Sequence, residues 1–285
     1  MMKILSKSSS AALITILAFT FACKQNDEKN VAPNNKVSEK VLHQINALGF
    51  TNTGVIKTDG GYIVEGDIFL SEADLNSTPK QHNLVVGKSE QFRTSNVVST
   101  NGNRNITIYA PTGYRGYSAA MLAGLDEAIS RYNALGLDLT FSRTTSSWYA
   151  DIKMTRLSTT DEQRGVLGSA GFPTNGNPYN EIKMSGVLES SYGLSTDGIA
   201  TIIGHEMGHC IGFRHTDYFD RSISCGGSTA NEGASDVGAI NIPGTSKDAD
   251  LADNGSWMLA CTDGSDRPFT SGDRSALNWM YKDNF

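Results

Sequence analysis

One stretch of the sequence, HEMGHCIGFRH, limits what this chain can fold into more than any other. It places His205, Glu206, His209, Gly212 and His215 at fixed spacings. Residues four apart lie on one face of an α-helix, so a helix here turns the imidazoles of His205 and His209 toward one point. Gly212 can adopt the left-handed conformation that ends a helix, which lets the chain turn back and bring in His215.

Three imidazoles at one point predict a metal site. Neutral imidazole suits Zn²⁺, and three protein ligands leave one tetrahedral position open, which is typical of a catalytic zinc. A single histidine among apolar residues could be a core residue, but the third histidine and the glycine make that coincidence improbable. We therefore predict one Zn²⁺ on His205, His209 and His215. Glu206 can reach a water at the metal without binding the metal, so it is the predicted general base and acid.

The pattern H-E-x-x-H-x-x-G-x-x-H resembles that of the metzincin zinc endopeptidases. Within that clan, GHEMGHCIGFRHTD is similar to the dual-action HEIGH metallopeptidase family, with Met207 in place of the usual isoleucine. The resemblance implies a methionine turn beneath the metal, for which Met258 in GSWM is the candidate. Some relatives bind the metal through a tyrosine two residues after that methionine, where this chain has Ala260.

The resemblance also implies an α+β fold of metzincin type over residues 102–285. Such a domain has a mixed twisted sheet, the active-site helix, and a C-terminal subdomain with the methionine turn and a closing helix, here PFTSGDRSALNWMY. The implied substrate is a protein or peptide, bound as an added strand at a free sheet edge that we place at residues 165–173. Two alternatives remain: a non-catalytic binding lipoprotein that keeps the fold, and a zinc hydrolase of non-peptide amides. The presence of Glu206 favours catalysis.

The N-terminus carries signals for export. A positively charged start precedes an apolar run at residues 11–22 that is too short to span a bilayer as a mature helix and is followed by Cys23. We expect residues 1–22 to be a lipoprotein-type signal peptide, Cys23 to carry lipid, and residues 23–36 to be a polar tether. An ordinary secretory signal with an incidental cysteine is the alternative. The expected location is the outer membrane or cell surface, and otherwise the periplasm or the medium.

Residues 37–101 are expected to form a small helix-hairpin prosegment and its connection to the catalytic domain. A helical stripe ends at Gly49, and two apolar runs flank Asp59-Gly60-Gly61 as in a hairpin. The second run, YIVEGDIFL, is expected to be a strand. Its EGD resembles the F-x-G-D element of astacin-like prosegments, with Val64 in place of the phenylalanine. That resemblance implies that Asp67 caps the zinc and keeps the chain a latent zymogen; a plain bulge or turn is the alternative.

Three cysteines lie beyond the N-terminal one, and an odd number in an exported chain suggests one disulfide and one buried thiol. Cys225 and Cys261 lie in loops near the predicted metal site, so we expect a bridge between them and a reduced Cys210. Asp217, two residues after the third histidine, is a candidate to orient a ligand imidazole. A surface carboxylate in a turn is an equally good interpretation of Asp217.

The charges of the chain point to no nucleic-acid partner. Of its 285 residues, 24 are Lys or Arg and 30 are Asp or Glu, which gives a formal charge of −6 without a basic cluster. The expected partners are therefore a protein or peptide substrate and the membrane that holds the lipid. The acidic run KDADLADN at residues 247–254 could bind Ca²⁺, although such loops are usually only solvated.

Overall fold

The computed structural model of the chain describes residues 36–76, 91–114, 116–234, 238–245 and 255–283. Residues from 36 onward belong to one compact unit. The expected signal peptide, Cys23, nearly all of the tether and the acidic run at 247–254 lie outside the described residues. Within the described residues, no helix has the length and hydropathy of a membrane span.

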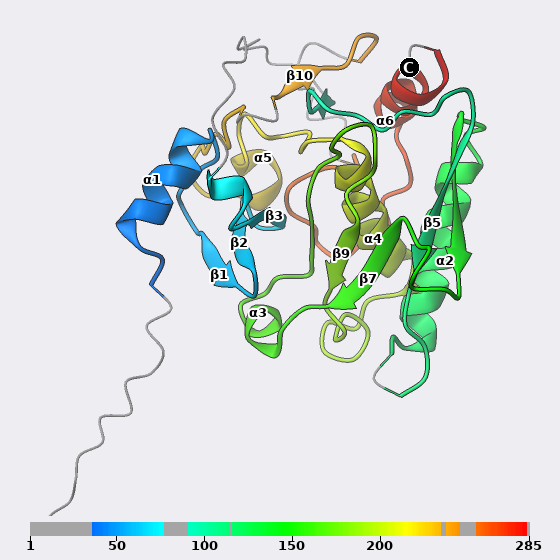
Figure 1. Cartoon of the computed structure of the whole chain (residues 1–285), viewed down its shortest axis with the longest axis horizontal. Helices are drawn as coiled ribbons and strands as arrows, with labels where there is room; N and C mark the ends of the chain where they lie inside the picture. Colours follow the sequence, from blue (N-terminus) through cyan, green and yellow to red (C-terminus); the bar gives the residue numbers. More distant parts are fainter. Residues whose placement is uncertain (1–35, 77–90, 115, 235–237, 246–254, 284–285) are drawn as a thin grey trace, which may run out of the picture. The chain divides into compact units, whose positions relative to one another are not determined.

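An eight-stranded mixed sheet forms the centre of this unit (Figure 1), in the order β1-β2-β3-β8-β9-β7-β5-β6. Four strands run parallel to one another: β5 (Arg104–Tyr109), β6 (Leu139–Thr144), β7 (Ile152–Arg156) and β9 (Glu181–Met184). The short strand β8 (Gly168–Ala170) pairs antiparallel with β9. This arrangement agrees with the mixed sheet expected from the sequence.

Two helices pack against each other and against the sheet, α2 (Ala119–Asn133) and α4 (Thr196–Ile211). The hydroxyl of Ser195 caps α4 by accepting a hydrogen bond from the backbone N–H of Gly198. Gly212 ends the helix in the left-handed conformation, with φ 113°. The apolar side chains of α2, α4 and the sheet form the main core. The helix carrying the first two histidines therefore begins and ends where its sequence predicted, and it is buried along nearly its whole length.

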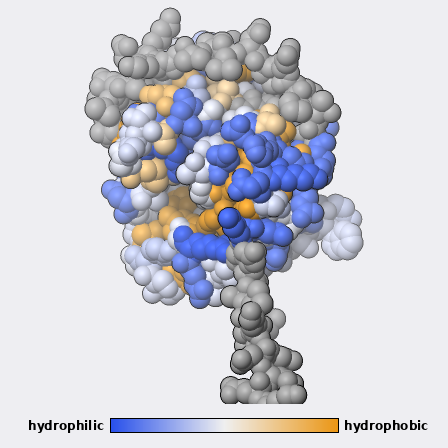
Figure 2. Space-filling model, turned by 90° about the vertical axis from the view of Figure 1, so that its left-hand side faces the viewer, coloured by the Kyte–Doolittle hydropathy of each residue, from blue (hydrophilic) through white to orange (hydrophobic). Residues whose placement is uncertain are grey.

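The N-terminal part of the described chain contains α1 (Glu39–Ala47), β1 (Ile56–Thr58), β2 (Gly61–Val64), β3 (Ile68–Ser71) and the 3₁₀ turn Asp74–Asn76. It has a small apolar core of its own. Figure 2 views the side of the molecule where α1 and β1 lie: hydrophilic residues predominate there, and hydrophobic ones show in the middle of the face.

The run YIVEGDIFL forms two strands rather than one continuous strand, which confirms the alternative interpretation of its EGD as a turn. Val64 pairs with Ile68 in the antiparallel pair β2–β3, so Glu65, Gly66 and Asp67 form the loop of a hairpin. Glu65 and Gly66 both have positive φ angles, 55° and 97°, which turn the chain tightly. We call residues 61–71 the N-terminal hairpin.

The N-terminal hairpin occupies the sheet edge that was expected to be free. Strand β3 pairs with β8 in parallel, with Ile68 opposite Ala170. The backbone N–H of Ala170 donates a hydrogen bond of 3.1 Å to the carbonyl oxygen of Asp67. The sheet thus runs without interruption from the hairpin into the catalytic part.

The segment that follows residue 90 belongs to the catalytic part rather than to a connection. Strand β4 (Phe92–Arg93) pairs antiparallel with β10 (Ile240–Asn241), and Thr94 N–H donates to the carbonyl of Gly212 at 2.8 Å. Gln91 and Phe92 are fully buried. The catalytic part therefore begins at or before Gln91, upstream of the boundary expected at residues 101 and 102.

The remaining helices are short: α3 (Thr159–Gln163), α5 (Ser222–Cys225) and α6 (Ser271–Asn278), which a π-helical turn at Trp279–Asp283 extends. A capping box between Thr270 and Asp273 starts α6. Asp273 also accepts a hydrogen bond from Ser256 Oγ at 2.8 Å and one from Gln91. The closing helix is thus tied both to the segment before Met258 and to the start of the catalytic part.

Candidate metal centre

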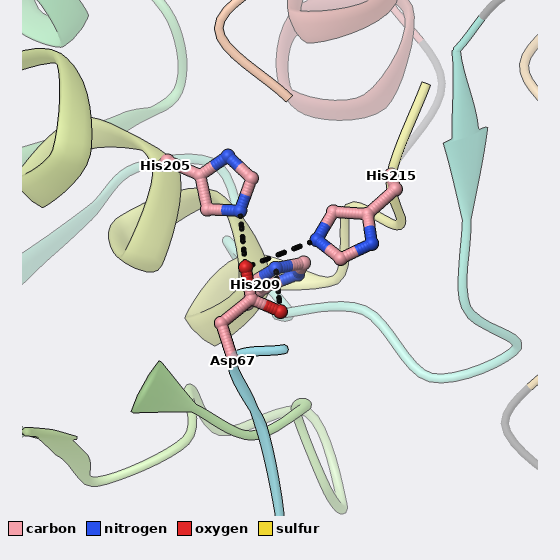
Figure 3. A group of neighbouring side chains, drawn as sticks. All are labelled: Asp67, His205, His209 and His215. Carbon is pink, nitrogen blue, oxygen red and sulfur yellow. Dashed lines mark hydrogen bonds and ion pairs between the residues drawn. The ribbon is translucent and has the colours of Figure 1, made fainter. Parts of the chain in front are cut away.

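Three imidazoles and one carboxylate meet at the C-terminal half of α4 (Figure 3). His205 and His209 come from the helix, and the turn at Gly212 brings in His215. The carboxylate belongs to Asp67 in the loop of the N-terminal hairpin. The facing atoms of the four groups all lie within 4.8 Å of one another. Asp67 Oδ2 is 3.1 Å from His205 Nε2 and 3.2 Å from His215 Nε2.

Backbone carbonyls fix the tautomers of the first two imidazoles. His205 Nδ1 lies 2.8 Å from the carbonyl oxygen of Trp257, and His209 Nδ1 lies 2.9 Å from that of Phe213. Because a carbonyl oxygen only accepts, each Nδ1 carries the proton and donates it. Each Nε2 then presents a lone pair to the meeting point, as a metal ligand must.

For the third imidazole, a buried glutamate rather than a backbone carbonyl is the hydrogen-bond partner of Nδ1. His215 Nδ1 lies 2.8 Å from Glu232 Oε1, and both side chains are fully buried. The expectation for Asp217 was wrong: its carboxylate accepts hydrogen bonds from Ser224 Oγ at 2.6 Å and Ala260 N–H at 2.9 Å, and none from the three histidines. Glu232 follows His215 by 17 residues in a stretch without periodicity, so no sequence signal marks it.

The four groups fit a divalent cation. Asp67 Oδ1, His209 Nε2 and Glu206 Oε2 are buried and have no hydrogen-bond partner among the described residues. Buried polar atoms are nearly always satisfied, so three unsatisfied ones around one point indicate a missing partner. Three imidazole lone pairs and a carboxylate attract a cation and suit tetrahedral coordination. Within the described residues this is the single group of three or more His, Cys, Asp or Glu side chains close enough to hold a metal.

Glu206 lies beside this point but outside the ligand set. Its side chain is buried below β8, where any side chain at Gly168 would overlap its carboxylate. Burial, and then the negative charge of Asp67, raise the pKa of Glu206 well above its usual value. A carboxyl group with a raised pKa next to a metal can accept a proton and return it near neutral pH.

Met258 packs against the side of α4 that carries Gly208. Its Sδ would be 2.5 Å from a Cβ placed at Gly208, and the neighbouring Trp257 ring would be 3.3 Å away. Trp257 Nε1 donates to the carbonyl oxygen of Gly204 at 3.0 Å. Gly204 and Gly208 of α4 therefore both face Trp257, and of these two only Gly208 needs to lack a side chain.

This difference predicts opposite effects for two matched substitutions. Gly208→Ala should lower the free energy of unfolding by about 1–3 kcal/mol, because the new methyl group overpacks against Met258. Gly204→Ala, with its nearest atoms at 3.8 and 4.0 Å, should be neutral or raise it by up to about 1 kcal/mol through helix propensity. Urea unfolding of both variants measures the difference. Equal effects would contradict the packing of Met258 against α4.

A disulfide joins helix α5 to the segment that follows Met258. Cys225 in α5 is bonded to Cys261, three residues after Met258, which is the pairing expected from the sequence. Cys210 on α4 is free and buried. The bridge holds α5 beside the segment that carries Met258.

Comparisons with known proteins agree with this geometry. Residues 62–281 match the family model described as dual-action HEIGH metallo-peptidase, so the match includes the N-terminal hairpin as well as the metal centre. A search of curated proteins found no match.

Two solved structures show weak similarity. The crystal structure of myroilysin aligns over 65% of this chain and 94% of its own at 13% identity, with a TM-score of 0.36. The GM1-bound form of the ECX AB5 holotoxin aligns over 48% of this chain and 66% of its own at 14% identity, with a TM-score of 0.29. Similarities this low do not assign the chain to a family. The family model does, because it matches most of the chain, including its three histidines. The chain belongs to the dual-action HEIGH metallopeptidase family.

Proposed function

We propose that this chain is an exported, zinc-dependent endopeptidase that its own N-terminal hairpin holds latent. One observation carries the proposal: three buried imidazole Nε2 atoms converge on the Asp67 carboxylate, with the unpartnered carboxyl of Glu206 beside them. His205, His209 and His215 would hold the Zn²⁺. The presence of Glu206 in this position favours catalysis over a binding role.

The chemistry divides between the metal and the protein. Zn²⁺ would supply a Lewis acid that polarises the scissile carbonyl and lowers the pKa of water. Glu206 would take the proton of the attacking water and pass it to the leaving amine. An extended peptide would pair with β8, and the loss of one hairpin strand from that edge would make room for it. Met258 would form the apolar floor beneath the metal.

The path of the N-terminal hairpin supports an endopeptidase. The hairpin passes its internal loop over the metal centre, with chain continuing on both sides through Val64 and Ile68. A site that accepts a continuous chain has room on both sides of the metal, as cleavage within a polypeptide requires. An exopeptidase would need one side closed to recognise a chain end.

The loop of the N-terminal hairpin would also keep the full-length chain inactive. Asp67 would take the ligand position that the three histidines leave open, because a carboxylate is a good zinc ligand. Its backbone carbonyl binds Ala170 of β8, so the hairpin also covers the strand that a substrate would pair with. Activation would therefore require release of the hairpin from β8.

Export and a lipid anchor at Cys23 complete the proposal, and they rest on the N-terminal sequence alone. Cell fractionation tests them: the chain should be found with membranes, and Cys23→Ser should release it. A Cys23→Ser variant that stays membrane-bound would refute the anchor.

Metal removal tests the catalytic proposal. We would insert a specific protease site between Asn76 and Gln91, cut the folded chain there, and digest a proteome-derived peptide library. Mass spectrometry should find internal cleavages that 1,10-phenanthroline abolishes and added Zn²⁺ restores. A cut, metal-loaded chain that cleaves no peptide would refute the proposed function.

A further inference from the structure

The third imidazole of the metal centre differs from the other two in the charge of its partner. His205 and His209 donate from Nδ1 to neutral backbone carbonyls. His215 donates to a carboxylate, because its Nδ1 lies 2.8 Å from Glu232 Oε1 and 3.0 Å from Oε2. Both of these side chains are fully buried. A carboxylate bound to one ring nitrogen fixes the direction of the ring and makes the other nitrogen a stronger metal ligand.

The catalytic part compensates the charge of this carboxylate and holds it in place. Arg221 Nη1 lies 3.0 Å from Glu232 Oε1, and Arg214 Nη2 lies 3.8 Å from Oε2. The backbone N–H of Glu232 donates to the carbonyl oxygen of Tyr218 at 2.8 Å. Two guanidinium groups and the imidazole of His215 thus surround one buried carboxylate, as a charge taken out of water requires.

Arg214 also fixes the segment that carries this glutamate. It donates to the carbonyl oxygens of the two following residues, Gly233 and Ala234, at 3.1 Å each. Arg214 directly precedes His215 in the chain. The backbone of the third ligand and the segment of its partner are therefore joined at one guanidinium. Arg214 binds Glu65 of the N-terminal hairpin as well, at 3.0 Å, but the two carbonyls belong to the catalytic part and do not depend on the hairpin.

We infer that Glu232 is a positioning residue of the metal centre. Its carboxylate directs the ring of His215 at the metal and makes this imidazole the strongest of the three ligands. Retention of the metal therefore depends on a residue outside the stretch that supplies the histidines. The inference rests on the zinc of the proposed function, but it does not require that the chain cleaves peptides. A glutamate that only compensated two arginines would affect stability and leave the affinity for zinc unchanged.

The affinity of the full-length chain for zinc distinguishes these two roles. Glu232→Gln keeps the shape of the side chain and one acceptor oxygen but removes the charge. The chains are equilibrated in solutions whose free zinc is set by a chelator, and the zinc on the folded fraction is measured by mass spectrometry. The Kd for zinc should rise about tenfold or more in Glu232→Gln. The visible absorption spectrum of the Co²⁺-substituted variant should also differ from that of the parent, because it reports the ligand geometry.

Glu232→Asp gives the same test with the charge kept. Its carboxylate can still compensate the two arginines, so this variant guards against failure of the glutamine variant to fold. The shorter side chain withdraws the carboxylate from His215 Nδ1, which lies 2.8 Å from it in the parent. The Kd for zinc should therefore rise at least threefold in this variant too.

Asp217→Asn is the matched control. Asp217 is buried and lies two residues from His215 in sequence, but its carboxylate binds Ser224 and Ala260 instead of a ligand. Its Kd for zinc should stay within twofold of the parent, even where its stability falls. Unchanged zinc affinity in both Glu232 variants overturns the inference, as does an equal loss in Asp217→Asn. A parent that holds zinc but cleaves no peptide refutes the proposed function alone, whereas a parent that holds no zinc refutes both.

Discussion

Replacement of Glu206 by glutamine should lower kcat/KM of the cut chain for peptides by about 10²- to 10⁴-fold, the usual contribution of a positioned general base and acid. Glutamine has nearly the same shape as glutamate but cannot accept the proton. Glu206 stands beside the ligand set rather than in it, so the variant should still hold about one zinc per chain. Peptide cleavage by the cut chain, with zinc measured by mass spectrometry, gives both quantities.

Two histidine variants separate loss of chemistry from loss of metal. His205→Ala removes one of the three converging Nε2 atoms and should lose both zinc and cleavage. His43→Ala in the full-length chain removes an exposed histidine of α1 and should keep its zinc. Cleavage by Glu206→Gln within tenfold of the parent would show that another group moves the proton.

Asp67→Ala should raise peptide cleavage by the full-length chain at least tenfold. The Asp67 carboxylate lies 3.1 Å from His205 Nε2 and 3.2 Å from His215 Nε2, in the position that an attacking water needs. Removing it opens that position while β3 still pairs with β8. The variant should therefore remain less active than the cut chain, in which the whole hairpin can leave. Initial rates on one fluorogenic peptide, at equal zinc content, measure all three forms.

Asp59→Ala serves as the control for this variant. Asp59 is an exposed carboxylate in the turn between β1 and β2, in the same N-terminal part but away from the metal centre. Its loss should leave the rate of the full-length chain unchanged. If Asp67→Ala and the parent cleave at equal rates, the loop is a structural turn and not a latency switch.

Local spacing allowed the metal centre to be predicted from the sequence. The histidines at 205 and 209 share a helix face by periodicity, and Gly212 supplies the turn that brings in His215. None of this depends on distant parts of the chain. The bounds of α4 could be predicted for the same reason, since Ser195 caps one end and Gly212 the other.

Some contacts between distant segments could not be predicted, although the bridge between Cys225 and Cys261 was. Asp217 was chosen because it is close to His215 in sequence, but the chain turns its carboxylate toward Ser224 and leaves His215 to Glu232. The turn at Glu65 was only one of two interpretations of its apolar run, because a glutamate gives no sign of the positive φ it adopts. Phe92 was assigned to a connection because its strand partner, Asn241, lies far along the chain.

If the hairpin leaves as proposed, strand β8 becomes the border of the sheet. A strand with unpaired backbone groups at the border of a sheet is a template for self-association and aggregation. Here that strand is only Gly168–Ala170, and Pro173, which has no N–H to donate, follows closely. Such a short border can accept a few residues of extended peptide, yet it gives a second copy of the sheet little to extend. The proposed release of the hairpin would therefore expose an edge that can bind a peptide but gives little support for association between copies of the enzyme.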